Sequence, residues 1–411
     1  MDKKEGYCKT DGKLKRCLGL FSVTLAGTGI ILGAGIYALI GVGSNLAGNA
    51  IWLSFLIASL VAIFTGLSYA ELSSIFKVDA GEYNYIERVF NKKLAFIIGL
   101  MIIFTGIVSA ATVALGFGGY INFLIEFSVI KWAIILTILM AVINYIGIRE
   151  TAIFNDLSGI VELIGLILII VLGIKYFGNV NYFEMPKGFI GVLQASALVF
   201  FAYMGFETIV KLSEETKEPQ KTIPKGIMLS VVIATILYVL TSISAVSILG
   251  WKELGSTSSP LAKVAEASFG GIAFFVLTVI ALFSTSNTVL LTNVTTSRLV
   301  YGMAEEKSLP RFLGVIHEKH RTPYVAAFAL AILSIIFIFI GDIEFVANLN
   351  NIFLFLTFIF VNLTVIVLRY KYKNLRRNFR IPLNIGRFPV LALFGMLTSI
   401  FLLIFTISNI I

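Results

Sequence analysis

Six glycines crowd one strongly apolar stretch of the chain, "GTGIILGAGIYALIGVG" at residues 27–43. They are Gly27, Gly29, Gly33, Gly35, Gly41 and Gly43. A glycine weakens a helix interior by about 1 kcal/mol relative to alanine, so this density predicts an interrupted helix, with Gly33 and Gly35 in the non-helical turn. The free N–H groups and positive dipole end of the second half-helix could bind a carboxylate there. The alternative is close helix packing through small residues, which is favoured more for Gly41 and Gly43 than for Gly33 and Gly35.

A second stretch of small and aromatic residues, "FFAYMGFET" at residues 200–208, predicts another interruption. Phe201, Ala202, Met204 and Gly205 precede the acidic Glu207. Aromatic side chains at such a break could cover a small ligand. Packing aromatics are the alternative, because 13% of the chain is aromatic.

The elements that must position these residues are membrane spans. Of the 411 residues, 58% are hydrophobic and only 13% are charged, whereas soluble proteins carry about 25% charge. We therefore expect an all-α polytopic membrane protein. Eleven apolar stretches are long enough to be spans: 20–44, 49–76, 94–124, 131–147, 153–174, 188–211, 224–249, 267–301, 323–341, 345–368 and 388–410.

The distribution of basic residues predicts the orientation of these spans. With the N-terminus inside, the inner segments hold 27 of the 32 Lys and Arg residues. This asymmetry follows the positive-inside rule, so the net charge of +9 reflects topology and not nucleic-acid binding. We expect a cytoplasmic basic tail at 1–18 and, with eleven spans, an extracellular C-terminus. The inner loops "VDAGEYNYIERVFNKK" and "EEKSLPRFLGVIHEKH" are expected to form short amphipathic helices. Glu71, at the end of span 2, is expected to be an interfacial charge.

The residues needed for enzymatic or metal chemistry are missing from the predicted spans. They contain no His or Cys and no paired carboxylates at helical spacing, so we expect no enzyme and no metal site. Cys8 and Cys17 are expected to be free thiols in the tail, and His317 and His320 to be loop residues. No Walker A motif is present and no cofactor is expected.

The two interrupted spans occupy corresponding places. They are the first and the sixth, so they enter the membrane from opposite sides. Interrupted spans in corresponding positions of two inverted halves indicate a transporter binding site. We divide the chain into repeat 1 at 19–176, repeat 2 at 187–369 and an additional helix at 388–411.

The sequence resembles the amino acid–polyamine–organocation (APC) transporter family. The matching stretches are "GAGIYALIG", "SYAELSSIFKVDAGEYNYIERVF", "FAYMGFETIVKLSEETKEPQKTIPKGI" and "TTSRLVYGMAEEKSLPRFLGVIHEKHRTPYVA", in family order. The resemblance implies a five-plus-five inverted repeat, alternating access and an amino acid substrate bound at both breaks. Carried over by position, it implies contacts from Ile31, Gly33, Ala34, Gly35, Phe201, Ala202 and Met204, with Phe201 as an aromatic gate.

The resemblance also implies a coupling site. Proton-coupled relatives carry a lysine in span 5, and alignment puts Glu162 there. A buried carboxylate must pair, bind a cation or take a proton, so we expect proton exchange, or alternatively sodium binding. Ser284, Ser286 and Asn287 of span 8 would face Glu162. A structural hydrogen bond between helices is the alternative.

The expected substrate is a neutral amino acid. Span 3 has no acidic residue that could hold a cationic side chain, although Glu207 keeps a cationic amino acid or polyamine as an alternative. A membrane sensor without transport activity is the alternative of another class, but we expect no soluble output domain. We expect a multi-pass protein of the cell membrane, surrounded by lipid.

Overall fold

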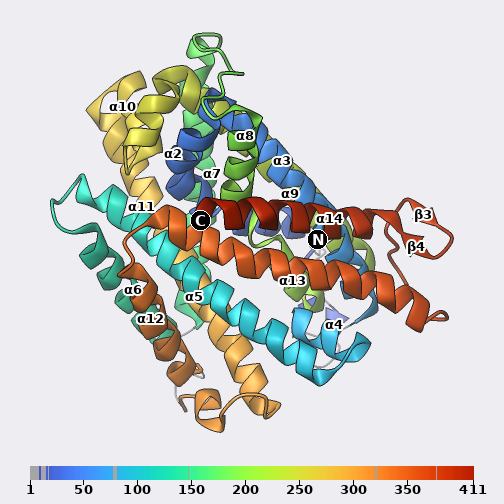
Figure 1. Cartoon of the computed structure of the whole chain (residues 1–411). Helices are drawn as coiled ribbons and strands as arrows, with labels where there is room; N and C mark the ends of the chain where they lie inside the picture. Colours follow the sequence, from blue (N-terminus) through green and yellow to red (C-terminus); the bar gives the residue numbers. More distant parts are fainter. Residues whose placement is uncertain are drawn as a thin grey trace, which may run out of the picture.

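The protein is an all-α polytopic membrane protein, as a computed structural model shows (Figure 1). The structure describes residues 9–10, 15–16, 18–76, 81–146, 148–318, 320, 322–375 and 377–411. The expectation for Cys8 and Cys17 falls outside these ranges. The α-helices are α1 (Leu20–Ile31), α2 (Gly35–Ala47), α3 (Ile51–Ile75), α4 (Gly81–Val89), α5 (Lys92–Asn122), α6 (Val129–Ile146), α7 (Ile148–Gly173), α8 (Gly188–Val199), α9 (Pro219–Ser256), α10 (Pro260–Phe269), α11 (Gly271–Glu305), α12 (Tyr324–Ile338), α13 (Ile343–Lys371) and α14 (Val390–Ile410).

The apolar helices correspond to the predicted spans. Within the described ranges, nine helical segments are long and apolar enough to cross a membrane. One of them, Gly35–Ile75, joins α2 and α3, which a short 3₁₀ turn at Gly48–Ala50 separates. Two shorter apolar helices, α1 and α12, lie where spans 1 and 9 were predicted. The count of eleven spans and the inverted repeat stay predictions.

Both predicted interruptions are present. The first separates α1 from α2 at residues 32–34. The second follows α8, where 3₁₀ turns at Phe200–Tyr203 and Phe206–Glu214 flank Met204 and Gly205. Gly33 lies inside the first break, whereas Gly35 is the first residue of α2.

Several connections differ from the sequence-based expectation. The segment before span 8 forms the separate helix α10. The inner loop at 77–93 contains a short amphipathic helix, α4, as expected. A second amphipathic helix was expected at residues 305–320, but the residues described there form only a 3₁₀ turn at Arg311–Gly314 after the end of α11. A small antiparallel hairpin, β3 (Asn384–Ile385) and β4 (Phe388–Pro389), precedes α14.

Close packing explains many of the glycines. A Cβ atom on Gly41 would lie 2.8 Å from the Leu254 carbonyl oxygen, and one on Gly43 would lie 2.9 Å from a Val199 methyl group. Carbon atoms at such distances overlap, so these two glycines let α2 approach α8 and α9. The packing alternative is therefore supported for Gly41 and Gly43.

Candidate functional site

The first break exposes backbone N–H groups at the start of α2. The first four N–H groups of an α-helix have no partner within the helix. One of them, that of Ala34, donates to the Thr288 hydroxyl of α11 at 3.1 Å. The following N–H groups, from Gly35 onward, carry the positive end of the helix dipole. Gly33, Ala34 and Gly35 line a cavity at this break.

The second break is a sharp turn at Gly205. Its φ of 112° is open to glycine but unfavourable for other residues. The Gly205 N–H donates to the Glu207 carboxylate at 2.9 Å, and the Thr208 hydroxyl donates to the Gly205 carbonyl at 2.8 Å. These local bonds replace the helical ones that the turn removes.

The two breaks are in direct contact. A Cβ atom on Gly35 would overlap the Cα atom of Ala202, and it would lie 2.9 Å from the Ala202 methyl group. A Cβ atom on Gly205 would lie 2.7 Å from Ile30 in α1. The two interrupted spans, far apart in the sequence, therefore meet backbone to backbone at positions where only glycine fits.

Tyr238 of α9 bridges the breaks. Its hydroxyl lies 2.7 Å from the Ile31 carbonyl oxygen and 2.8 Å from the Ala202 carbonyl oxygen, and the side chain is fully buried. Each carbonyl belongs to the end of a helical segment. The one hydroxyl proton thus serves two backbone acceptors that their own helices leave open.

We expect Tyr238→Phe to weaken substrate affinity at least fivefold and to lower the melting temperature. The buried Ile31 and Ala202 carbonyls would lose their donor, which costs about 1–3 kcal/mol. Ligand-binding and thermal-unfolding measurements check this. Tyr120→Phe is the matched control, because the Tyr120 hydroxyl also donates to a buried carbonyl, that of Tyr37. Unlike Ile31 and Ala202, Tyr37 does not line the cavity. Tyr120→Phe should lower the melting temperature but leave substrate affinity unchanged. An equal loss of affinity in both variants would contradict a special role for Tyr238.

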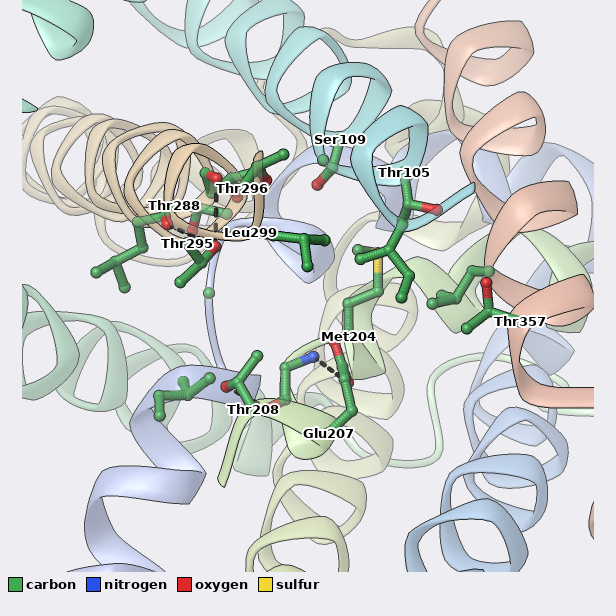
Figure 2. A pocket seen from close by; sticks show the side chains of 18 of the residues that line it. Thr105, Ser109, Met204, Glu207, Thr208, Thr288, Thr295, Thr296, Leu299 and Thr357 are labelled. Atoms are coloured by element: carbon green, nitrogen blue, oxygen red, sulfur yellow. Dashed lines mark hydrogen bonds between the residues drawn. The ribbon is translucent and has the colours of Figure 1, made fainter. Parts of the chain in front are cut away.

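A cavity of about 700 Å³ lies against both breaks (Figure 2). The sequence-predicted contacts Ile31, Gly33, Ala34, Gly35, Phe201, Ala202, Met204, Gly205 and Glu207 all line it. Figure 2 shows Thr288, Thr295 and Thr296 of α11, Thr105 and Ser109 of α5, and Met204, Glu207 and Thr208 around one open space. Hydroxyl and backbone groups therefore dominate its polar surface near the breaks.

The cavity extends toward one end of the molecule. Its lining continues to Glu82 and Tyr83 of α4 and to Arg298 and Glu306 near the end of α11. Charged residues gather at this end, whereas the part beside the breaks is lined mainly by apolar side chains and hydroxyls.

A polar cluster joins the elements at the opposite end. Asn49, in the turn between α2 and α3, donates to the Glu184 carboxylate at 2.8 Å. The Trp251 indole donates to the same carboxylate at 2.9 Å, and the Trp251 N–H donates to the Asn49 side-chain oxygen at 3.0 Å. We call these three residues the outer cluster. It ties the loop before α8 to the end of α9 and to the α2–α3 turn.

Glu162 lies on the buried face of α7. The exposed residues on the other side of this helix are Ile160, Ile164, Ile167 and Val171. The Glu162 side chain is fully buried and faces Ser284 and Asn287 of α11. Within the described chain, neither carboxylate oxygen forms a hydrogen bond of standard geometry, and the same is true of the Ser284 hydroxyl.

The expected coupling residues are not all at one place. Ser284 and Asn287 are three residues apart, so they share one face of α11, whereas Ser286 lies about 160° around the helix from Ser284. Asn287 lines the cavity and donates to the Asn155 side chain at 3.2 Å. It thus connects the cavity to the surroundings of Glu162. The role of Ser286 stays a prediction.

Sequence reasoning missed Thr288, Tyr238 and the polar residues of α5. Thr288 directly follows the expected Asn287, and it contacts the first break through Ala34. Tyr238 is a single hydroxyl in an apolar span, and only the folded structure places it between two interruptions. Thr105 and Ser109 are four residues apart in an otherwise apolar span, so they share one face of the helix. This spacing could have indicated a polar face toward the cavity.

Metal-binding side chains do not gather in this cavity. Groups of three or more His, Cys, Asp or Glu suited to a metal do not occur among the residues that the structure describes. His317 and His320 stack on each other at 5.0 Å between ring centroids, beside Tyr145.

Comparison with known proteins agrees with this architecture. The profile of the amino acid permease family matches residues 18–410. The chain is 31% identical to the branched-chain amino acid permease BcaP of Bacillus subtilis, over 95% of this chain and 88% of the relative. It is 28% identical to the methylthioribose transporter of the same organism, over 90% of this chain and 84% of the relative. It is 27% identical to cationic amino acid transporter 4 of Mus musculus, over 87% of this chain and 60% of the relative.

The matched region includes both broken spans, the cavity and nearly every described helix. Together with the backbone contacts between the two breaks, this match shows that the chain belongs to the amino acid permease family of the APC superfamily.

Proposed function

We propose that this protein is a secondary active transporter that moves neutral amino acids across the cell membrane by alternating access. The observation that carries the proposal is the meeting of two interrupted spans at a cavity that the first residue of α2 lines. Amino acid transport itself is the activity of the family to which the chain belongs.

The α-carboxylate binds at the start of α2. The N–H groups from Gly35 onward and the helix dipole favour an anion there, and the missing side chains at Gly33 and Gly35 leave room for it. The α-amino group binds carbonyl oxygens of the second break, between Phe201 and Met204. Phe201 lies beside both groups and covers the bound substrate as a gate.

The side chain of the substrate occupies the part of the cavity near α5. This helix contributes Thr105 and Ser109 but no acidic residue to the lining. A hydroxyl-bearing and apolar wall accepts aliphatic side chains, and the similarity to branched-chain amino acid permeases supports the same class.

A cationic amino acid is the second candidate. Glu207 and Glu82 both line the cavity, and several relatives are named cationic amino acid transporters. We rank it lower because the Glu207 carboxylate already accepts the Gly205 N–H and so helps to hold the turn.

Competition for uptake into proteoliposomes distinguishes the two candidates. We expect leucine, valine, alanine and serine to inhibit uptake of labelled leucine at concentrations at least tenfold lower than arginine or lysine require. The physical reason is the absence of a carboxylate on the α5 wall, which would leave a buried ammonium or guanidinium unpaired. If arginine and lysine inhibit more strongly than the neutral amino acids, the ranking is wrong. Glu207→Gln would then selectively remove their binding.

We infer the orientation from the charges. The positive-inside distribution favours a cytoplasmic N-terminus, with α4 and the end of α11 on the same side, and an extracellular C-terminus. The cavity then opens to the cytoplasm, and the outer cluster closes the extracellular side. A proton, or alternatively sodium, drives the cycle through Glu162.

A further inference from the structure

A second pocket, of about 260 Å³, lies next to the β3–β4 hairpin. All residues that line it are basic: Arg369, Lys373, Arg377, Arg380 and Arg387. We call it the basic pocket. Figure 1 shows the hairpin at the common end of α13 and α14, which run side by side.

Most of the positive charge in the basic pocket is not neutralised. Glu71 of α3 is the carboxylate that contacts it within the described chain. Arg369 binds Glu71 through two nitrogens at 2.9 and 2.5 Å, and Arg377 lies 3.5 Å away. The sequence contains no Asp or Glu from residue 345 to residue 411. Five cationic side chains therefore face one anion.

The remaining protein partners of the pocket are mostly neutral acceptors. Arg377 donates to the carbonyl oxygens of Leu375 and Tyr372 at 3.1 and 3.2 Å, and Arg380 donates to that of Gly386 at 2.9 Å. The buried Arg377 Nε atom is the one that lies 3.5 Å from the Glu71 carboxylate, and it forms no hydrogen bond of standard geometry. Like charges so close together are repulsive, so an external anion would stabilise this arrangement.

Glu71 holds the pocket together and does not occupy it. Its side chain is fully buried, and one of its oxygens accepts the Ile381 N–H at 2.9 Å. Glu71 was expected to be an interfacial charge at the end of span 2. Instead it anchors the segment between α13 and α14 to α3.

Two apolar side chains at the hairpin project away from the protein. Leu383 and Ile385 are 68% and 76% exposed. Leu383 has a φ of 56°, which a residue with a branched side chain adopts only under local constraint. Because the hairpin connects two membrane-spanning helices, this apolar tip and the basic pocket lie at one membrane surface. Soluble phosphate would not need the apolar tip, whereas a lipid has acyl chains to contact it.

We propose that the basic pocket binds the phosphate group of an anionic phospholipid, while Leu383 and Ile385 contact its acyl chains. Guanidinium groups fit phosphate oxygens through paired hydrogen bonds, and four of the five lining residues are arginines. Basic pockets between helices at the cytoplasmic surface suit anionic headgroups. The bound lipid supplies the negative charge that the chain from residue 345 onward lacks.

The test variant is Lys373→Gln/Arg387→Gln. Both side chains are exposed, and both changes leave the Glu71–Arg369 pair and the Arg380 hydrogen bond in place. Lys93→Gln/Arg311→Gln is the matched control, because it removes the same charge from two exposed residues that the charge pattern places on the same membrane side. Native mass spectrometry of the purified full chain measures binding of dioctanoyl phosphatidylglycerol and of dioctanoyl phosphatidylcholine.

We expect the wild type to bind phosphatidylglycerol at least twentyfold more tightly than phosphatidylcholine. One basic residue near an anionic lipid surface is worth roughly a fivefold change in binding. The test variant should therefore bind phosphatidylglycerol at least tenfold more weakly, and the control should stay within twofold of the wild type. The reversal Lys373→Glu/Arg387→Glu should remove the preference completely.

Three results would overturn the proposal. The first is unchanged phosphatidylglycerol binding by the charge-reversal variant. The second is an equal loss of phosphatidylglycerol binding in the test and control variants, which would mean that the lipid is attracted by the overall positive charge and not by this pocket. The third is displacement of phosphatidylglycerol by 1 mM inorganic phosphate beyond the effect of chloride at equal ionic strength, which would identify a site for soluble anions. Folding of each variant is checked by size-exclusion chromatography and by amino acid binding.

Discussion

Gly35→Leu should abolish substrate binding while the protein still inserts and folds. A Cβ atom at this position would overlap the Ala202 backbone, so a leucine must push the two breaks apart. The same side chain would cover the N–H groups proposed to bind the carboxylate. We expect the dissociation constant to rise at least a hundredfold, as measured by scintillation proximity or calorimetry on detergent-purified protein.

Gly29→Ala is the matched control for this change. Gly29 lies in the same interrupted span and also lines the cavity, but its Cβ would lie 3.9 Å from the nearest atom, Cα of Gly159. Alanine also improves helix propensity inside α1. We expect near wild-type affinity in this control. Wild-type affinity in Gly35→Leu would instead mean that the site lies elsewhere and that these glycines serve packing alone.

Glu162→Gln should uncouple transport from the ion gradient. Glutamine has nearly the same shape as protonated glutamic acid but cannot exchange a proton or hold a cation. The carboxylate faces Ser284 and Asn287 without standard hydrogen bonds, so the change removes no ion pair. We expect exchange of labelled for unlabelled leucine to continue, and uphill accumulation to fall to a ratio of about one.

The measurement is uptake against imposed pH and sodium gradients. One pH unit corresponds to about 1.4 kcal/mol, which can support roughly tenfold accumulation for one proton per substrate. The control is Glu126→Gln, the same chemical change at an exposed loop residue. If accumulation in Glu162→Gln follows both gradients as in the wild type, Glu162 is a structural group and coupling occurs at another residue.

The sequence predicted the fold class because the physical signals were strong. Apolar stretches of about 20 residues have few alternatives to helices in a membrane. A glycine cluster marked the first break, and a stretch of small and aromatic residues marked the second. The sequence did not predict α10, because the ten residues Pro260–Phe269 mix polar and apolar side chains as a loop before a membrane span also does. The sequence also placed Gly35 inside the break, whereas the structure begins α2 at this residue. The exact end of a helix depends on tertiary contacts, such as the hydrogen bond from Ala34 to Thr288, which the local sequence does not reveal.

The site was predicted less completely than the fold for a related reason. Gly33 and Phe201 could be proposed because their local sequence is unusual for a membrane span. Tyr238 and Thr288 act through distant partners, and their own sequence surroundings are ordinary. The pairing of Glu71 with Arg369 spans 298 positions of sequence, so spacing alone could not reveal it.

The outer cluster has a pharmacological consequence. Asn49, Glu184 and Trp251 hold three separate segments together at the end of the molecule opposite the cavity opening. An antibody fragment that recognises the joined segments would bind this conformation and not one in which they separate. Because a ligand shifts a conformational equilibrium by its preference for one state, such a fragment would stop the transport cycle without competing for the amino acid site. In the proposed orientation, the surface over the outer cluster is therefore a target for noncompetitive inhibition from outside the cell.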